Sequence, residues 1–265
     1  MVETAAHMVE HVFPAVAVRQ WVVVFLKRVR YFLNIDAGCL NRVAGIVMRE
    51  VQRATASTST APAARSGGVL FVHRFGAALN AHVHLHLCVL DGVVAQGRWG
   101  LEFRGAQVDE ACAERVQALV RQRVLELFER RGILSSETVA EMQGWGHSGG
   151  FSVHAGVRVA APDRAGRERL LRYCARPMFA GERLVWAGGG AQVRYRLPWA
   201  ALAGHRRGQQ RSIELQMSCS DFLDRIAALI PPPPKHRQRY FGILAPTSPW
   251  RMLVTAQAGR STQRW

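Results

Sequence analysis

The chain has 265 residues, of which 49% are hydrophobic, so it is long enough for one large or two modest cores and is not a disordered chain. Its 35 Lys and Arg residues against 19 Asp and Glu give a net charge of +16, which indicates a polyanionic partner. Only Lys27 and Lys235 are lysines. A genome rich in arginine codons would explain Arg over Lys, but not the excess over acids.

Cysteine usage and apolar runs predict the compartment. The apolar run Trp21–Leu26 has only the length of a strand, so we expect no membrane span and no membrane partner. The N-terminus MVETAAHMVE lacks the apolar region of a signal peptide. Five cysteines without a CxxC pair indicate reduced thiols in a cytoplasmic protein: Cys39, Cys88, Cys112, Cys174 and Cys219.

The first part of the chain predicts two helices around one strand, followed by a loop. The apolar residues of the second helix recur at helical spacing, whereas the loop is small, polar and interrupted by Pro62. In chain order these elements are Thr4–Val12 (helix), Arg19–Leu26 (strand), Gly38–Thr55 (helix) and Ala54–Ser66 (loop).

Two apolar runs, Val69–Phe75 and His82–Val89, then predict neighbouring antiparallel strands joined by a short turn. The second run alternates, so its two kinds of side chain face opposite ways. One face holds His82, His84, His86 and Cys88, and the other holds Val83, Leu85, Leu87 and Val89.

The second half of the chain alternates helices with short strands. Asp109 and Asp163 are each placed to cap the helix that follows. The expected elements are helices at Val108–Arg131, from Ser135 and Ser136, at Asp163–Ala175 and at Ser220–Ile230, strands at Phe151–Ala160 and Ile213–Gln216, and a hairpin at Val185–Leu197. This order predicts an α+β fold with a mainly antiparallel central sheet flanked by helices.

Three histidines on one strand face are a candidate metal site. Residues two apart on a strand are separated by about 6.5–7 Å, so two of the rings can meet one ion, either His82 with His84 or His84 with His86. His73 on the neighbouring strand can approach the same ion. The alternative is a polar sheet face whose histidines are only hydrogen-bonded; we favour the metal site.

Several blocks of the chain resemble one known family. The segment RFGAALNAHVHLHLCVLDGVV (74–94) resembles the metal-binding segment of HUH-type transposases, in which a hydrophobic residue separates two histidines. Residues 12–33, 151–184 and 228–255 resemble further parts of these rolling-circle insertion-sequence enzymes, often called two-tyrosine transposases. The resemblance implies an HUH-nuclease-like fold and a transposase that binds, cleaves and rejoins single-stranded DNA at element ends.

Tyr173 is the candidate nucleophile. It lies in an arginine-rich predicted helix, where positive charge favours phosphate binding and the phenolate; the alternative is ordinary packing beside Leu170. The block RYCARP resembles the family's tyrosine motif, which implies a 5′-phosphotyrosyl intermediate and a free 3′-hydroxyl. Pro177 occupies the position of the family's second tyrosine, so the chain is similar to single-tyrosine members.

The resemblance also implies the remaining site. It places Mg²⁺ or Mn²⁺ at His84 and His86, with His73 as the expected third ligand and His82 as its competitor, and it implies no small-molecule cofactor. Tyr240 and Phe241 either stack on bases or pack in the core. The expected DNA-binding residues are Arg172, Arg176, Lys235, Arg237 and Arg239.

Departures from the family pattern lead to a second hypothesis. Relatives carry a zinc-binding module ahead of the region matched by 12–33, so we expect an N-terminally truncated copy. Phe241 and Thr247 stand where relatives carry histidine and asparagine. The alternative function is therefore an inactive remnant that retains DNA binding. A third possible function is a metal-dependent phosphodiesterase that uses water as the nucleophile.

The expected division of the chain is an N-terminal segment (1–66), a catalytic core (67–200) and a basic DNA-binding region (201–265).

Overall fold

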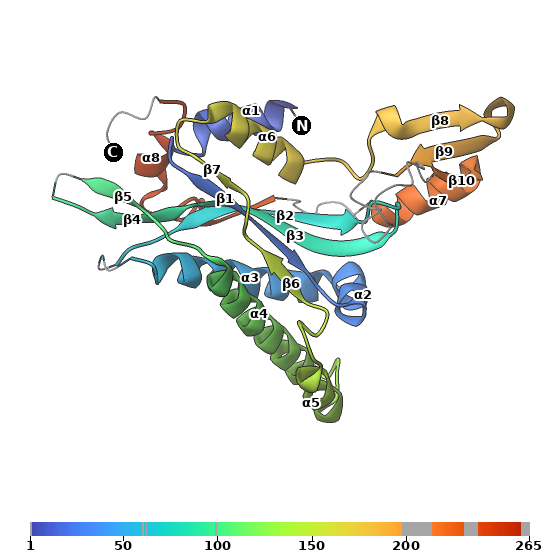
Figure 1. The fold of residues 1–265 in the computed structure, drawn as a ribbon, viewed down its shortest axis with the longest axis horizontal. Helices are drawn as coiled ribbons and strands as arrows, with labels where there is room; N and C mark the ends of the chain where they lie inside the picture. The colour runs from blue at the N-terminus through green and yellow to red at the C-terminus, as the bar shows by residue number, and fades with distance from the viewer. Residues whose placement is uncertain are drawn as a thin grey trace. The chain divides into compact units, whose positions relative to one another are not determined.

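The computed structural model describes residues 2–59, 61, 63–98, 100–197, 214–230 and 238–260. These residues form two compact units (Figure 1). The larger unit comprises Met1–Val72, His84–Arg176 and Arg237–Trp265, and the smaller unit comprises His73–Val83 and Pro177–His236. The three-part division expected from the sequence stays a prediction.

A six-stranded sheet is the centre of the fold. Its strands follow the order β11-β2-β3-β1-β6, and β7 also pairs with β1. The ladders of β1 with β3, β6 and β7 and of β11 with β2 are all antiparallel, which confirms the predicted fold class. The bounds are β1 Val18–Val24, β2 Gly67–Phe75, β3 Ala81–Leu90, β6 Ser152–His154, β7 Arg158–Val159 and β11 Gln238–Gly242.

Helices cover both faces of the sheet within the larger unit (Figure 1). On one face lie α1 (Val2–His11) and α6 (Arg164–Cys174), which contact each other and share a core with β1, β2, β3 and α8 (Arg251–Thr255). On the other face lie α2 (Lys27–Ile35), α3 (Ala37–Ala56) and α4 (Glu110–Arg130), with α5 (Ser136–Gly144) beyond α4. None of the helices in the described ranges has the length and apolar character needed to cross a bilayer.

Short polar side chains begin the main helices. The carboxylates of Asp36, Asp109 and Asp163 each accept a hydrogen bond from the backbone N–H three residues further on. The predicted caps at Asp109 and Asp163 are therefore confirmed.

The α2 helix was not predicted from the sequence. It buries only Val29 and Leu33, so its apolar stripe is narrow and does not stand out beside four charged or polar neighbours.

Three further differences from the predicted elements concern the larger unit. The expected loop from Ala54 begins later, because α3 continues to Ala56. The single strand expected over Phe151–Ala160 consists of the two short strands β6 and β7. A hairpin of β4 (Gly92–Gln96) and β5 (Leu101–Gly105) was not predicted at all.

The smaller unit contains a three-stranded antiparallel sheet with one helix. The strands β8 (Leu184–Ala187), β9 (Gln192–Arg196) and β10 (Glu214–Ser218) lie in the order β10-β9-β8, and α7 spans Cys219–Leu229. The predicted hairpin is confirmed, and the glycines that turn it, 188–190, all have positive φ. The core of this unit consists of Leu79, Val193, Tyr195, Met217 and Phe222.

Candidate active site

The histidines of β3 lie on the sheet face that α6 covers. His84 and His86 are 8% and 2% exposed, and Cys88, two residues further on the same face, belongs to the core shared with α6. The β1 strand fixes this face through the pairs Val24 with His84 and Val22 with His86. The alternation predicted from the sequence therefore places two imidazoles in a buried position.

His73, His84 and His86 form the one group of potential metal ligands found among the described residues. Each offers a ring nitrogen, these nitrogens all lie within 4.8 Å of one another, and all three residues are buried. His82 is partly exposed and does not belong to the group. Neutral imidazole is a common ligand of divalent first-row metals, so the donor set can hold a metal ion.

Tyr173 projects from α6 beside this group. Leu170, Leu171 and Cys174 anchor the buried side of the helix, whereas Tyr173 is 46% exposed. Its ring centroid lies 5.5 Å from that of His86, at an interplanar angle of 71°. This exposure excludes simple core packing of the phenol and leaves part of the side chain accessible to a ligand.

Two arginines flank Tyr173 in the sequence, Arg172 before it and Arg176 after it. The guanidinium carbon of Arg176 lies 4.7 Å from the centroid of the Tyr173 ring, which is a cation–π distance. Arg172 precedes the tyrosine on α6 and is exposed. Two guanidinium groups therefore lie near Tyr173. The neighbouring Cys174 is a poorer candidate nucleophile, because it is buried and burial raises the pKa of its thiol to about 12.

Gln20 is a site residue that sequence reasoning missed. It is 6% exposed, and its Nε2 lies 3.0 Å from Nδ1 of His86 and 3.6 Å from Sγ of Cys174. Gln20 pairs with Cys88 across β1 and β3, so both side chains share the face that carries His86. The sequence feature that could have pointed to Gln20 is a single side-chain amide inside the mainly apolar predicted strand RQWVVVFL.

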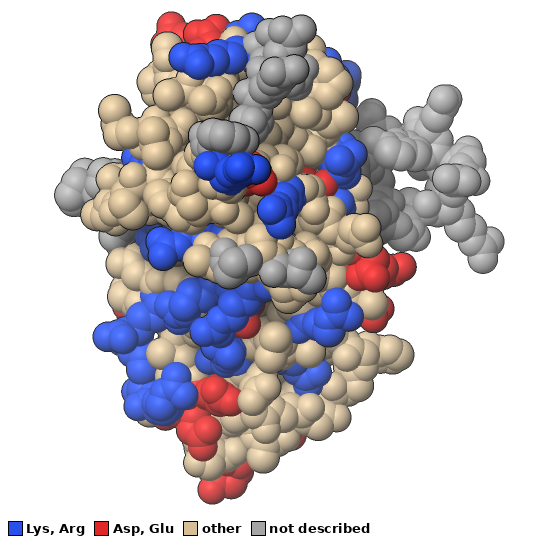
Figure 2. All heavy atoms as spheres, turned by 90° about the vertical axis from the view of Figure 1, so that its left-hand side faces the viewer, with Lys and Arg blue, Asp and Glu red and all other residues tan. Residues whose placement is uncertain are grey.

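The expected DNA-binding residues are not all brought together. Arg172 and Arg176 lie at Tyr173, whereas Arg239 lies on β11, where its guanidinium donates to Oδ1 of Asn41 on α3 and burial lowers its pKa. Lys235 and Arg237 lie outside the described residues. Lys and Arg side chains also gather on the face drawn in Figure 2.

The block around residue 240 contributes to packing. Phe241 is 5% exposed, and its ring lies over Gly68, where an added Cβ would meet the Phe241 ring at 3.0 Å. Tyr240 is partly buried against the core that α1 and α6 share with the sheet, and the guanidinium carbon of Arg251 lies 5.1 Å from its ring centroid. Of the two roles considered for this pair, core packing is the one that the structure supports.

Comparison with known families identifies the class of protein. The family model Y2_Tnp, described as "Putative transposase", matches residues 67–251, which is more than half of the chain, and the chain belongs to this transposase family. Membership implies DNA as the partner and DNA processing as the general activity. Neither the curated proteins nor the solved structures contain a match.

Proposed function

We propose that the chain is a transposase of the HUH type that cleaves and rejoins single-stranded DNA through a covalent bond to Tyr173. The observation that carries the proposal is the position of an exposed tyrosine whose ring lies 5.5 Å from His86, one of three clustered and buried histidines. A nucleophile, a candidate metal site and cationic side chains are the components that phosphoryl transfer requires.

The chemistry follows from these positions. Oη of Tyr173 attacks a backbone phosphorus and loses its proton, while the bond from phosphorus to the 3′-oxygen breaks and that oxygen takes up a proton. The products are a 5′-phosphotyrosyl bond and a free 3′-hydroxyl, and attack by a 3′-hydroxyl on the phosphotyrosine reverses the step. Pro177 follows in place of a second tyrosine, so the proposal uses one nucleophile.

His84, His86 and His73 would hold Mg²⁺ or Mn²⁺. When bound, such an ion polarises a phosphoryl oxygen and stabilises the charge that develops on the leaving oxygen. Three neutral imidazoles bring no negative charge, so the DNA phosphate is the natural partner for the charge of the ion. Arg172 is exposed beside Tyr173 and can hold the strand backbone, and Arg176 covers the tyrosine ring.

The test is adduct formation. Labelled single-stranded DNA that carries the ends of the surrounding element is incubated with the protein and Mn²⁺, and the products are separated on a denaturing gel. We expect a covalent adduct that is lost in Tyr173→Phe and with a chelator. Tyr31→Phe is the matched control, because Tyr31 is also exposed but lies on α2, and it should form the adduct normally.

Two outcomes would replace the proposal. DNA binding without an adduct on a verified end sequence would indicate a remnant that retains only binding. Cleavage that survives Tyr173→Phe would indicate a metal-dependent phosphodiesterase that uses water as the nucleophile.

A further inference from the structure

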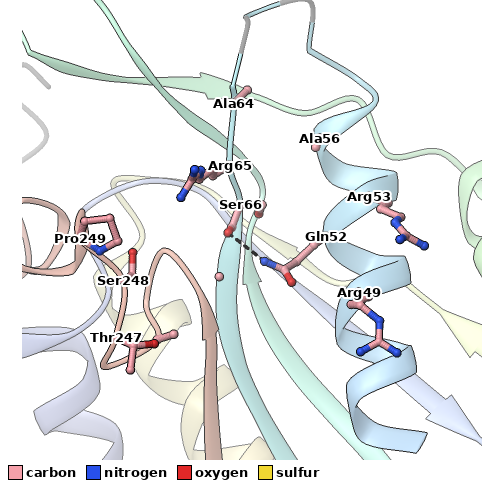
Figure 3. Close-up of a pocket in the computed structure, with 12 residues that line it drawn as sticks. Arg49, Gln52, Arg53, Ala56, Ala64, Arg65, Ser66, Thr247, Ser248 and Pro249 are labelled. Atoms are coloured by element: carbon pink, nitrogen blue, oxygen red, sulfur yellow. Dashed lines mark hydrogen bonds between the residues drawn. The ribbon is translucent and has the colours of Figure 1, made fainter. Parts of the chain in front are cut away.

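A pocket of about 510 Å³ lies in the larger unit, away from the histidines. It is formed by the last turns of α3, by the residues just before β2, and by the segment that follows β11 (Figure 3). Ser66 immediately precedes β2, whereas His73 lies six residues beyond the start of that strand, a span of about 20 Å in extended backbone. The pocket is therefore separate from the candidate metal site.

The lining of this pocket is cationic. Arg49, Arg53 and Arg65 contribute guanidinium groups, and no Asp or Glu is among the lining residues. Arg53 donates to the buried Glu50, which Arg123 also contacts at 2.9 Å, so Arg53 has a structural role as well. Arg49 and Arg65 are the two arginines of the lining best placed to meet an anion.

Arg65 is held in place at the pocket. Its backbone N–H donates to the carbonyl of Val94 at 2.9 Å, and its guanidinium carbon lies 5.2 Å from the centroid of the Trp250 ring. Stacking over an aromatic face occupies the plane of a guanidinium and leaves the N–H groups at its edge for an anion. A preorganised arginine loses less conformational entropy on binding than a freely moving one.

Neutral hydrogen-bonding groups complete the lining. Ser66 is only 2% exposed, and its buried Oγ has no hydrogen-bond partner among the described residues. The Ser66 carbonyl accepts from Nε2 of Gln52 at 3.3 Å, as Figure 3 shows. Buried hydroxyls normally have a partner, so this Oγ in a cavity wall is consistent with a ligand that supplies one.

Part of the lining is apolar. Ala245 and Pro249 follow β11, and Ala56 lies on α3. Gly242 also lines the pocket; its φ is +62° and an added Cβ would clash with the backbone oxygen of Ser66, so this position admits no side chain. Ligand pockets typically measure about 300–1,000 Å³, so this volume accommodates more than an isolated phosphate. Guanidinium groups from α3 and from Arg65, together with a small apolar surface after β11, suit a ligand that carries both a phosphate and a flat ring.

We propose that this pocket binds a nucleotide unit of the DNA strand, with its phosphate at Arg49 and Arg65 and its base against Ala245 and Pro249. The inference rests on the proposed function for the identity of the strand, but not on the chemistry of Tyr173. It gives the transposase a second contact with DNA, at a distance from the scissile phosphate.

The test is binding of the 5′-phosphorylated dinucleotide pdTpdT to the full chain by titration calorimetry. Arg49→Ala/Arg65→Ala should weaken binding about 10-fold or more, since each lost hydrogen bond involves a charged group. Arg115→Ala/Arg225→Ala removes the same charge from exposed positions outside the pocket and should change affinity less than about 2-fold. Equal losses in the two double variants would overturn the proposal.

A second variant separates shape from charge. Ala56→Phe keeps every arginine but fills the pocket, so it should also weaken dinucleotide binding. Unchanged affinity with an unchanged melting temperature would contradict the pocket assignment.

A second ligand tests the contact with the base. Inorganic pyrophosphate should bind more weakly than pdTpdT, and equal affinity of the two ligands would overturn the base contact.

Tyr173→Phe keeps this proposal distinct from the proposed function. That variant should bind pdTpdT like the wild type. Absence of a DNA adduct with intact dinucleotide binding overturns the cleavage chemistry alone. An adduct in a protein that does not bind the dinucleotide overturns the pocket alone.

Discussion

The side-chain amide of Gln20 lies 3.0 Å from Nδ1 of His86, and the same amide reaches Sγ of Cys174 at 3.6 Å. Gln20 therefore links the strand of the histidines to the helix residue next to Tyr173. A histidine that binds metal through Nε2 carries its proton on Nδ1, and the amide of Gln20 can turn so that its oxygen accepts a hydrogen bond from this N–H. We infer that Gln20 positions the His86 ring.

Replacing Gln20 should weaken metal binding. In Gln20→Leu the ring of His86 loses the hydrogen bond at Nδ1, and such changes around a metal site typically cost about 10–100-fold in affinity. Gln20→Glu should retain binding, because a carboxylate accepts the same bond. Mn²⁺ affinity, measured by calorimetry or by the EPR signal of free Mn²⁺, is the readout, and Gln122→Leu on the exposed side of α4 is the matched control. Wild-type affinity in Gln20→Leu would refute the positioning role.

The histidines of β3 provide an internal control for the metal site. His84→Ala should abolish tight Mn²⁺ binding and DNA adduct formation, whereas His82→Ala should preserve both, because only His84 belongs to the clustered group. Imidazole nitrogen binds first-row transition-metal ions more readily than it binds the hard ion Mg²⁺, so Mn²⁺ should support the adduct at lower concentration than Mg²⁺. Equal loss in the two variants would mean that the strand, and not the cluster, is what the reaction needs.

Asp91 should be important for stability and not for chemistry. Its carboxylate is buried and accepts hydrogen bonds from Nε of Arg19 at 2.6 Å and Nε of Arg158 at 2.5 Å, which ties β1 and β7 to the end of β3. Asp91→Ala leaves the largely buried Arg19 without its counter-charge, which typically costs about 3–5 kcal/mol. Arg158→Ala should cost about 1 kcal/mol or less, because that side chain is half-exposed. Urea unfolding measures both, and similar losses in the two variants would contradict this assignment.

The sequence predicted the parts of the site that depend on local pattern. Alternation along β3 placed His84 and His86 on one buried face, and the Asp163 cap defined the helix that carries Tyr173. These features depend on residues close together in the chain, where strand and helix periodicity act directly.

The remaining features depend on pairing between distant segments. Gln20 reaches His86 only because β1 pairs with β3 in a register that sets Gln20 opposite Cys88. The arginine-lined pocket likewise combines Arg49 with Arg65 and with residues near Pro249, almost two hundred positions further along the chain. No periodicity in a single segment encodes such a register, so both features required the three-dimensional structure.

The buried thiol of Cys174 predicts a loss of stability at alkaline pH. Burial raises its pKa from about 9 to about 12, so the folded state keeps the proton that the unfolded state releases. The stabilisation is fully present below pH 9 and is lost as the pH rises toward 12, at up to about 1.4 kcal/mol per pH unit. Urea unfolding between pH 8 and 11 should show a shallower decline in Cys174→Ala than in the wild type. Cys219→Ala, at a partly exposed position of α7, should follow the wild-type curve; a wild-type slope in Cys174→Ala would show that other groups cause the decline.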